Sequence, residues 1–183
     1  MRTTKSKELS KKIACDYAVW TVMSAFRQGP VGVRKRQVVQ EMLRVVDFAT
    51  VLDESKGPIT SVEFSAWHAA SVVAIVGTAG MKDEYGWAAK ALNVYLKTTS
   101  YVGGLGRKGL VARLHPPIDS GLWRGLRRRF AGNPALTAID HFRTIRSIRT
   151  PESYTTIING MRQLAQAENC LLIELEQYWL DAL

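Results

Sequence analysis

Asp119 is the residue best placed for chemistry, because it is the only acidic residue between Gly103 and Phe130 in a strongly basic stretch. Pro116 and Pro117 stiffen the turn that precedes it. A carboxylate held in such surroundings can act as a general base or stabilise a positive charge that develops in a reaction. It can equally be the N-cap of a helix, where the first backbone N–H groups bind it. An N-cap uses one carboxylate oxygen and leaves the other free, so both roles stay open.

The loop ahead of Asp119 mixes glycines with cations. It reads VGGLGRKGLVAR over residues 102–113 and contains Arg107, Lys108 and Arg113. Glycines let backbone N–H groups converge on an anion, and the neighbouring cations add charge. The order is not that of a Walker A loop, because Lys108 is followed by Gly109. The loop is therefore either a phosphate-binding loop or a flexible connector whose charges are solvated.

Arginines follow Asp119 on the next predicted helix. Arg124 and Arg128 lie four positions apart and share a face, and Arg127 lies one turn after Arg124. Residues 101–150 hold ten basic and two acidic residues, in a chain whose net charge is +9. This charge distribution indicates a surface that attracts polyanions. The predicted phosphate contacts are Arg107, Lys108, Arg113, Arg124, Arg127 and Arg128.

The histidines and cysteines show no metal-ligand spacing. The chain has three histidines and two cysteines, Cys15 and Cys170, and neither zinc-site nor nucleophile signatures occur. We therefore expect no metal and no cofactor. His68 follows Trp67 on an apolar helical stripe, which favours a hydrogen-bonded core residue over a ligand.

Composition indicates a cytoplasmic protein that does not contact membranes. Two cysteines are too few for a disulfide framework and agree with a reducing compartment. No apolar run approaches the roughly 18 residues of a membrane span, and no signal-peptide core follows the basic start.

The elements that must position these residues are predicted to be helices. At 183 residues the chain is long enough for one core, so we expect a single all-α domain, 1–183, with about seven or eight helices. Residues 1–12 form a basic, flexible N-terminal arm in this prediction. The predicted helices lie at about 13–27, 38–49, 61–75, 84–99, 120–131, 135–147, 151–168 and 171–179.

Local signals support several of these helices. Thr60 and Glu63 fit a capping box, and Thr150-Pro151 fits a helix start. Ile13, Tyr17, Trp20 and Val22 to Phe26 supply the apolar spacing of the first helix. Asn93 is a poor helix former inside the fourth helix, so it is either exposed or a buried hydrogen-bonding residue.

Two resemblances add to these expectations. Five motifs occur along the chain in this order: WH, G-x-A-x-K-x-L-N-x-Y-L-K, H-x-P-I-D, T-x-E-x-Y and E-x-x-W. This order resembles that of a family of small uncharacterised bacterial α-helical proteins. Its elements here are Trp67-His68, Gly86 to Lys97, His115 to Asp119, Thr150 to Tyr154, and Glu176 to Trp179. This resemblance implies a helical fold and a bacterial or phage setting, and no activity.

The stretch from Gly86 to Arg124 also resembles the helix-hairpin-helix DNA glycosylase superfamily. In that superfamily a hairpin glycine opens a helix, and a turn delivers a catalytic aspartate before a helix that carries an arginine; Asp119 and Arg124 match these two. The hairpin G-x-G is reduced to Gly86, and Ala88 stands where bifunctional members hold a Schiff-base lysine. Lys90 lies two positions further on, so the resemblance implies a monofunctional, aspartate-only enzyme that extrudes a base from the duplex.

Three functional hypotheses follow. The first is a nucleic-acid-binding protein, with DNA favoured over RNA, that contacts phosphates through the basic loop and the arginine-rich helix. The second is a DNA glycosylase-like enzyme with Asp119 as its catalytic carboxylate. The third is a protein-interaction subunit of a phage-defence or toxin–antitoxin assembly, with a partner on the acidic, aromatic C-terminal helix that ends at Tyr178-Trp179.

Overall fold

Helices connected by loops make up the whole of the described structure, a computed structural model that describes residues 4–27, 29–30 and 35–182. Within those residues there are eight α-helices, four shorter or irregular helical segments, and no strand. The all-α prediction is therefore confirmed, and the helices pack as a single compact unit.

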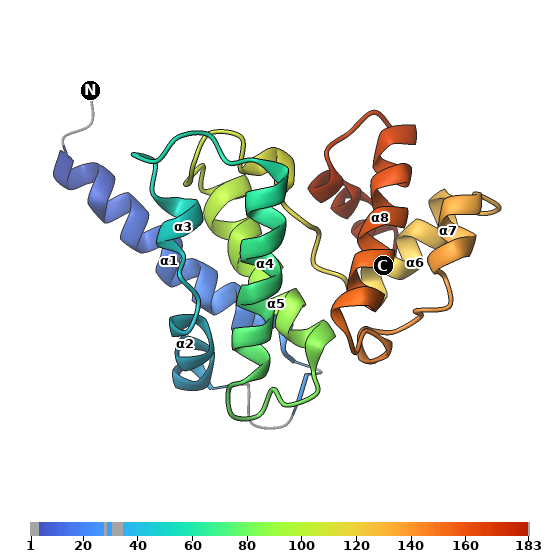
Figure 1. Ribbon diagram of the computed structural model, residues 1–183, viewed down its shortest axis with the longest axis horizontal. Coiled ribbons are helices and arrows are strands. Elements are labelled where there is room, and N and C mark those ends of the chain that lie inside the picture. The colour runs from blue at the N-terminus through green and yellow to red at the C-terminus, as the bar shows by residue number, and fades with distance from the viewer. Residues whose placement is uncertain (1–3, 28, 31–34, 183) are drawn as a thin grey trace.

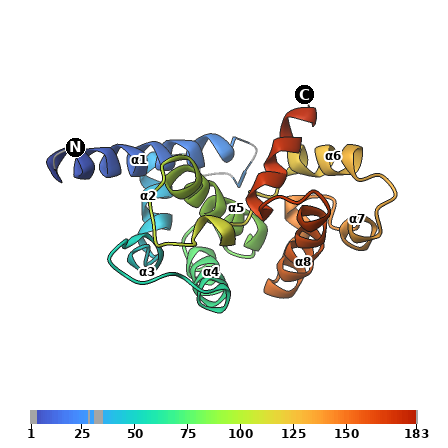
Figure 2. The ribbon, with the colours of Figure 1, turned by 90° about the horizontal axis from the view of Figure 1, so that it is seen from above.

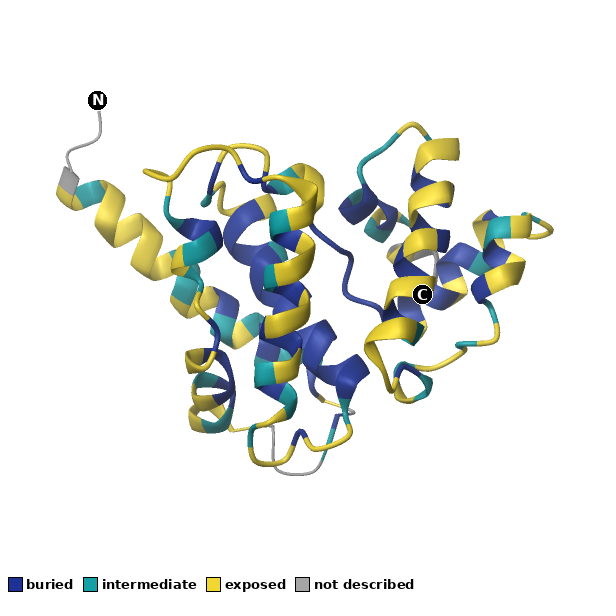
Figure 3. Ribbon diagram, viewed as in Figure 1, coloured by how far each residue is buried: buried dark blue, intermediate teal, exposed yellow. Residues whose placement is uncertain are grey.

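The helices fall into two halves along the long axis of the molecule (Figure 1). The first half contains α1 (Thr4–Ala25), α2 (Arg36–Arg44), α3 (Ala49–Leu52), α4 (Ser61–Val76), α5 (Tyr85–Leu96) and its π-helical continuation η1 (Lys97–Val102). The second contains α6 (Ser120–Arg129), α7 (Pro134–Ile139), η3 (Ile145–Ser147), α8 (Pro151–Ala167) and the 3-10 segment η4 (Leu172–Ala182). A short turn, η2 (Val111–Arg113), precedes the connector Leu114–Ile118, which is buried between the halves (Figure 3).

Helix α5 is the centre of the fold, because all twelve of its residues are buried. Helices α1 and α4 pack against it from the first half, and η3 packs against it from the second. Gly86 makes the contact between α5 and η3 possible. Its N–H donates to the carbonyl oxygen of Ile148 at 2.9 Å, and a Cβ at this position would collide with the carbonyl of Ile145. Side chains on α5 can therefore reach both halves.

The three helix starts that were predicted from capping residues are confirmed. Thr60 and Glu63 form a capping box at α4, and Thr150 caps α8 with Pro151 in its first turn. Asp119 is the N-cap of α6. These starts are decided within one helical turn, by side chains that bind otherwise unpaired backbone N–H groups.

Several predicted boundaries were wrong. The second predicted helix is divided into α2 and α3, because Asp47 turns the chain and accepts hydrogen bonds from the Ala49 N–H and the Thr50 hydroxyl. The sixth ends at Ile139, and only the short η3 turn follows. The expected N-terminal arm is helical from Thr4, as the first turns of α1; residues 1–3 lie outside the described part.

The apolar stripe predicted for the first helix is buried only in its C-terminal part. Val22 and Phe26 of that stripe are fully buried, whereas Ile13, Tyr17 and Trp20 are 58%, 55% and 54% exposed and Ala18 is buried in their place. Apolar residues lie on both sides of α1, and the packing of its C-terminal half against α5 decides which side is buried. In the part of the chain that the structure describes, no helix has the length and apolar character to span a membrane.

Candidate functional site

A pocket of about 780 Å³ lies where α1, α5, α6, η3 and η4 meet, and we call it the Lys90 pocket. Seen from above, α1, α6 and the C-terminal segment lie along the same side of the molecule (Figure 2). The pocket is lined by Ser24, Ala25, Arg27, Trp87, Lys90, Asp119, Ser120, Gly121, Arg124, Thr144, Ile145, Arg146 and Trp179.

Asp119 has partners on both carboxylate oxygens. Oδ1 accepts hydrogen bonds from the Leu122 N–H and from Nε1 of Trp179, each at 3.0 Å. Oδ2 lies 3.1 Å from Nζ of Lys90. The expectation that capping leaves one oxygen free was therefore wrong, because the second oxygen forms an ion pair with Lys90.

Lys90 is an unusual lysine, because only 9% of its side chain is exposed. Its Nζ also donates to the carbonyl oxygen of Ala25 at 3.2 Å and lies 5.2 Å from the ring centroid of Trp87. A carboxylate, a carbonyl and an aromatic face together stabilise this partly desolvated cation. One ion pair thus joins the end of α1, the middle of α5 and the start of α6.

In the sequence, Lys90 lies two positions beyond the place where bifunctional glycosylases hold their Schiff-base lysine, so the resemblance gives it no catalytic role. The structure nevertheless brings Lys90 into direct contact with Asp119, 29 positions later in the chain. The available sequence signal was a lysine inside an otherwise buried, alanine-rich helix. A charge in such a helix needs a partner, although the sequence does not say which one.

A second carboxylate lies near this ion pair. Glu176 forms an ion pair with Lys97 at 2.7 Å, and only 19% of its side chain is exposed. Burial raises the pKa of Glu176; the nearby Lys97 counteracts this, Asp119 adds to the rise, and Lys90 opposes it. Lys90, Asp119, Glu176 and Lys97 therefore form a group of alternating charges, of which Lys90 and Asp119 line the Lys90 pocket.

The rim of the Lys90 pocket is cationic. Arg27, Arg124 and Arg146 line it and are all exposed. Within the described residues none of the three forms an ion pair. Asp119, already paired with Lys90, is the one acidic residue among the described lining residues. Of the rim arginines, Arg124 was among the predicted phosphate contacts, and Arg146 belongs to a second row of arginines in the sequence, Arg143, Arg146 and Arg149. The packing of α1 and η3 beside α6, which brings Arg27 and Arg146 to this pocket, has no local sequence signal.

Arg107 corrects the prediction for the loop. It is 8% exposed, and its guanidinium binds the carboxylate of Glu63. Its other N–H groups donate to the carbonyl oxygens of Gly57, Thr50 and Pro58. The five donors of an arginine are well matched to this cage of acceptors. Arg107 therefore anchors the loop against α3 and α4 and is not available to phosphates.

The other predicted contacts do not gather in one place. Lys108 is exposed on the loop, and Arg113 lines a different pocket, together with residues of α4 and α8. Arg127 forms an ion pair with Asp140 at 2.5 Å and lies 5.8 Å from the ring centroid of Trp123. Arg128 is exposed on α6. Only Arg124 lies beside Asp119 in the Lys90 pocket.

Helices α4, α5 and α8 and the connector share a buried polar network. Nε2 of His68 and Oδ1 of Asn93 are 2.8 Å apart, and Nδ2 of Asn93 donates to the Tyr154 hydroxyl at 2.9 Å. That hydroxyl lies 3.0 Å from Nδ1 of His115. Burial lowers the pKa of His68 to about 4 and holds that of His115 well below its ordinary value, so both rings are neutral. The prediction that His68 is a hydrogen-bonded core residue is confirmed. Of the two alternatives for Asn93, exposed or buried and hydrogen-bonded, the structure shows the second.

Within the described residues there is no group of histidine, cysteine and acidic side chains that could hold a metal ion. Comparisons of the chain with protein-family models, with curated proteins and with solved structures give no match, so the function is inferred from the geometry of the Lys90 pocket.

Proposed function

We propose that this protein binds nucleic acid with the cationic rim of the Lys90 pocket. The observation that carries the proposal is the charge of the lining: three exposed arginines and one buried lysine against a single carboxylate that is already paired. An exposed guanidinium without an ion-pair partner offers its donors to phosphate oxygens. In this proposal the contacts come from α1, α6 and η3, and the glycine-rich loop has a structural role.

The walls of the pocket support a polymer that carries bases as well as phosphates. Trp179 is 38% exposed at the rim, and its indole is held in place by its hydrogen bond to Asp119. A partly exposed aromatic ring that is fixed in place can stack on an unpaired base. Arg124 and Arg146 lie beside it in the lining and can hold the adjacent phosphates. DNA is the first polymer to test.

The test is a fluorescence-anisotropy titration of labelled duplex and single-stranded DNA over a series of salt concentrations. We expect the triple variant Arg27→Gln, Arg124→Gln, Arg146→Gln to bind at least tenfold more weakly than the wild type. Its salt dependence on duplex DNA should also be shallower, by about 0.9 in the logarithmic slope for each phosphate that the variant no longer neutralises.

The matched control is Arg44→Gln, which removes an exposed arginine at the end of α2, away from the pocket lining. It should leave both affinity and salt slope unchanged. Equal affinities for the triple variant, the control and the wild type would contradict the proposal, as would absence of binding at low salt.

A second candidate, a DNA glycosylase-like activity, is favoured by the contact between Lys90 and Asp119. The Asp119 carboxylate can stabilise the positive charge that develops on the sugar when a glycosidic bond breaks. The base would have to leave the duplex to reach it, and a pocket of about 780 Å³ is large enough for one base.

Base release from a panel of duplexes with damaged or modified bases tests this candidate. We expect Asp119→Asn to abolish release and to retain DNA binding, because it removes the charge of Asp119 and leaves the rim arginines in place. Failure of the wild-type protein to release any base of the panel would rule out this candidate without affecting the binding proposal.

The protein-partner hypothesis rested on the C-terminal helix. Its aromatic residues make internal contacts: the Tyr178 hydroxyl donates to Glu168 at 2.7 Å, and Trp179 donates to Asp119. These contacts favour a role for η4 in building the Lys90 pocket over a role as a partner surface.

A further inference from the structure

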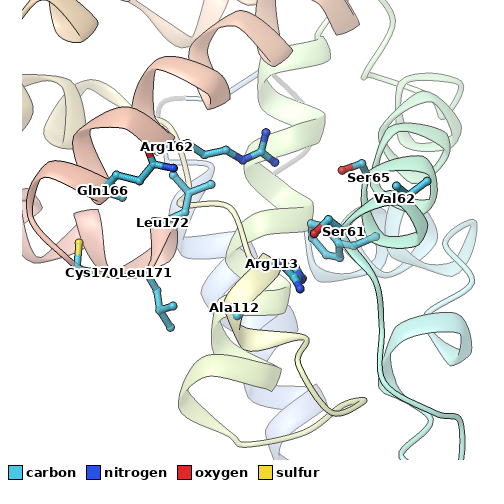
Figure 4. A pocket seen from close by; sticks show the side chains of 12 residues that line it. Ser61, Val62, Ser65, Ala112, Arg113, Arg162, Gln166, Cys170, Leu171 and Leu172 are labelled. Carbon is cyan, nitrogen blue, oxygen red and sulfur yellow. The ribbon is translucent and has the colours of Figure 1, made fainter.

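A second pocket, of about 550 Å³, opens between α4, η2, α8 and the start of η4 (Figure 4). We call it the α4–α8 pocket. In the view from above, α4 and α8 lie on the side opposite α1 and α6, so the two pockets occupy different faces (Figure 2). Its lining consists of Ser61, Val62, Phe64, Ser65, Ala112, Arg113, Arg162, Ala165, Gln166, Cys170, Leu171 and Leu172.

The charge of this lining has one sign. Arg113 and Arg162 are exposed, and neither forms an ion pair with any described residue. Arg162 uses one N–H group on the side chain of Asn159, at 2.9 Å, and keeps its other donors. No carboxylate belongs to the described lining. Two guanidinium groups without a counter-charge in one pocket favour an anionic ligand.

The polar groups are divided between facing walls. The Arg162 side chain extends from α8 toward α4, where Ser61 and Ser65 lie, and Arg113 lies between the two walls (Figure 4). The serine hydroxyls and the Gln166 amide can donate to the oxygens that the arginines do not reach. The donors therefore come from both sides of one opening, which suits a single compact anionic group.

The remaining lining is apolar. Val62, Leu171 and Leu172 contribute to it, and Phe64, which is 1% exposed, belongs to the core beneath it. A phosphate or sulfate ion alone would leave this surface in contact with water. Apolar walls with a few convergent polar groups are typical of sites for small organic molecules, and the volume lies within their usual range.

We propose that the α4–α8 pocket binds a small organic anion, in which a phosphate or carboxylate is attached to an apolar or aromatic body. Arg113 and Arg162 hold the anionic group, and the body lies against Val62 and the two leucines. Because the pocket is on a different face from the Lys90 pocket, this site is independent of the proposed nucleic-acid binding.

Isothermal titration of the full chain with four probes tests the proposal: phenyl phosphate, benzoate, phenol and inorganic phosphate. At least one of the two aryl anions should bind tenfold or more tightly than both phenol and inorganic phosphate, and the tighter aryl anion identifies the charged group. Aryl anions that bind no more tightly than inorganic phosphate would overturn the proposal.

Variants locate the binding. Arg113→Gln and Arg162→Gln should each weaken binding of the preferred aryl anion at least fivefold, whereas Arg44→Gln and Arg124→Gln should not change it. Both target side chains are exposed, so the variants should keep the wild-type circular dichroism spectrum. Unchanged binding in both variants would overturn the assignment to this pocket. Displacement of the aryl anion by duplex DNA would contradict the independence of this site from nucleic-acid binding and would make the pocket part of a nucleic-acid surface.

Discussion

At the scale of single residues, the contact between Lys90 and Asp119 dominates the Lys90 pocket. Removing charges from water is costly, and their mutual attraction offsets that cost only when further hydrogen bonds satisfy the remaining donors and acceptors. Here the Ala25 carbonyl serves the lysine, and Leu122 and Trp179 serve the aspartate. The pair is consequently both a connection between helices and the most polar point of the pocket.

We predict that Lys90→Met lowers the free energy of unfolding by about 3 kcal/mol, because it leaves the partly buried Asp119 without its counter-charge. Urea unfolding measured by circular dichroism checks this value. Lys82→Met, in an exposed turn before α5, is the control and should change stability by no more than about 0.5 kcal/mol. A destabilisation by Lys90→Met as small as that of the control would mean that the ion pair contributes nothing.

At the scale of elements, the close packing of η4 on α6 completes the Lys90 pocket. Gly121 and Gly125 lie one turn apart on the face of α6 that meets η4. A Cβ on Gly121 would collide with the Trp179 ring, and a Cβ on Gly125 would collide with the carbonyl of Tyr178. The two glycines let η4 approach closely enough for Trp179 to reach Asp119.

Gly125→Ala should therefore destabilise the protein by about 1–3 kcal/mol, since added volume in a tight contact forces the backbone to move. Helix propensity alone predicts the opposite sign, because alanine is favoured over glycine inside a helix by about 1 kcal/mol. Chemical unfolding followed by circular dichroism measures the destabilisation. Gly57→Ala, where a Cβ meets nothing within 4 Å, is the matched control.

At the scale of the whole molecule, the two halves share a buried polar network. His68 belongs to α4, Asn93 to α5, His115 to the connector and Tyr154 to α8. The Asn93 amide also donates to the carbonyl of Pro116 at 3.1 Å. A network of this kind stabilises one relative position of the halves only while the histidines stay neutral, because a buried imidazolium here would have no counter-charge.

The pH dependence of stability follows from these histidines. The folded pKa of His68 is about 4, below its ordinary value of 6.5, so between these values the unfolded chain binds a proton that the folded protein does not. Stability should therefore be complete above about pH 6.5 and fall by about 3 kcal/mol by pH 4, with His115 acting in the same direction.

Unfolding free energies measured from pH 7 to pH 4 check this prediction. His68→Gln keeps an amide that can bind Asn93 and has no imidazole to protonate, so its stability should fall less steeply with decreasing pH. His141→Gln changes an exposed histidine and should keep the wild-type dependence. Identical curves for His68→Gln and the wild type would contradict the prediction.

The amino-acid sequence by itself determined the helical class and most helix starts. The capping box of Thr60 and Glu63, the Thr150-Pro151 start and the Asp119 cap could all be predicted. Each depends on backbone N–H groups within one turn of the capping side chain, so the neighbouring residues contain the whole signal. The basic character of residues 101–150 is likewise a property of the sequence alone.

Only the tertiary structure decided which charges meet. Arg107 and Arg124 look alike in the sequence, yet Arg107 is enclosed by carbonyl oxygens and Glu63, while Arg124 lies at the rim of the Lys90 pocket. Lys90 reaches Asp119 because α5 is buried between both halves, and α1 turns Ala18 rather than Trp20 to the core. Contacts between residues far apart in sequence depend on how whole helices pack, and helix packing is set by the sum of many weak side-chain contacts that no local pattern contains.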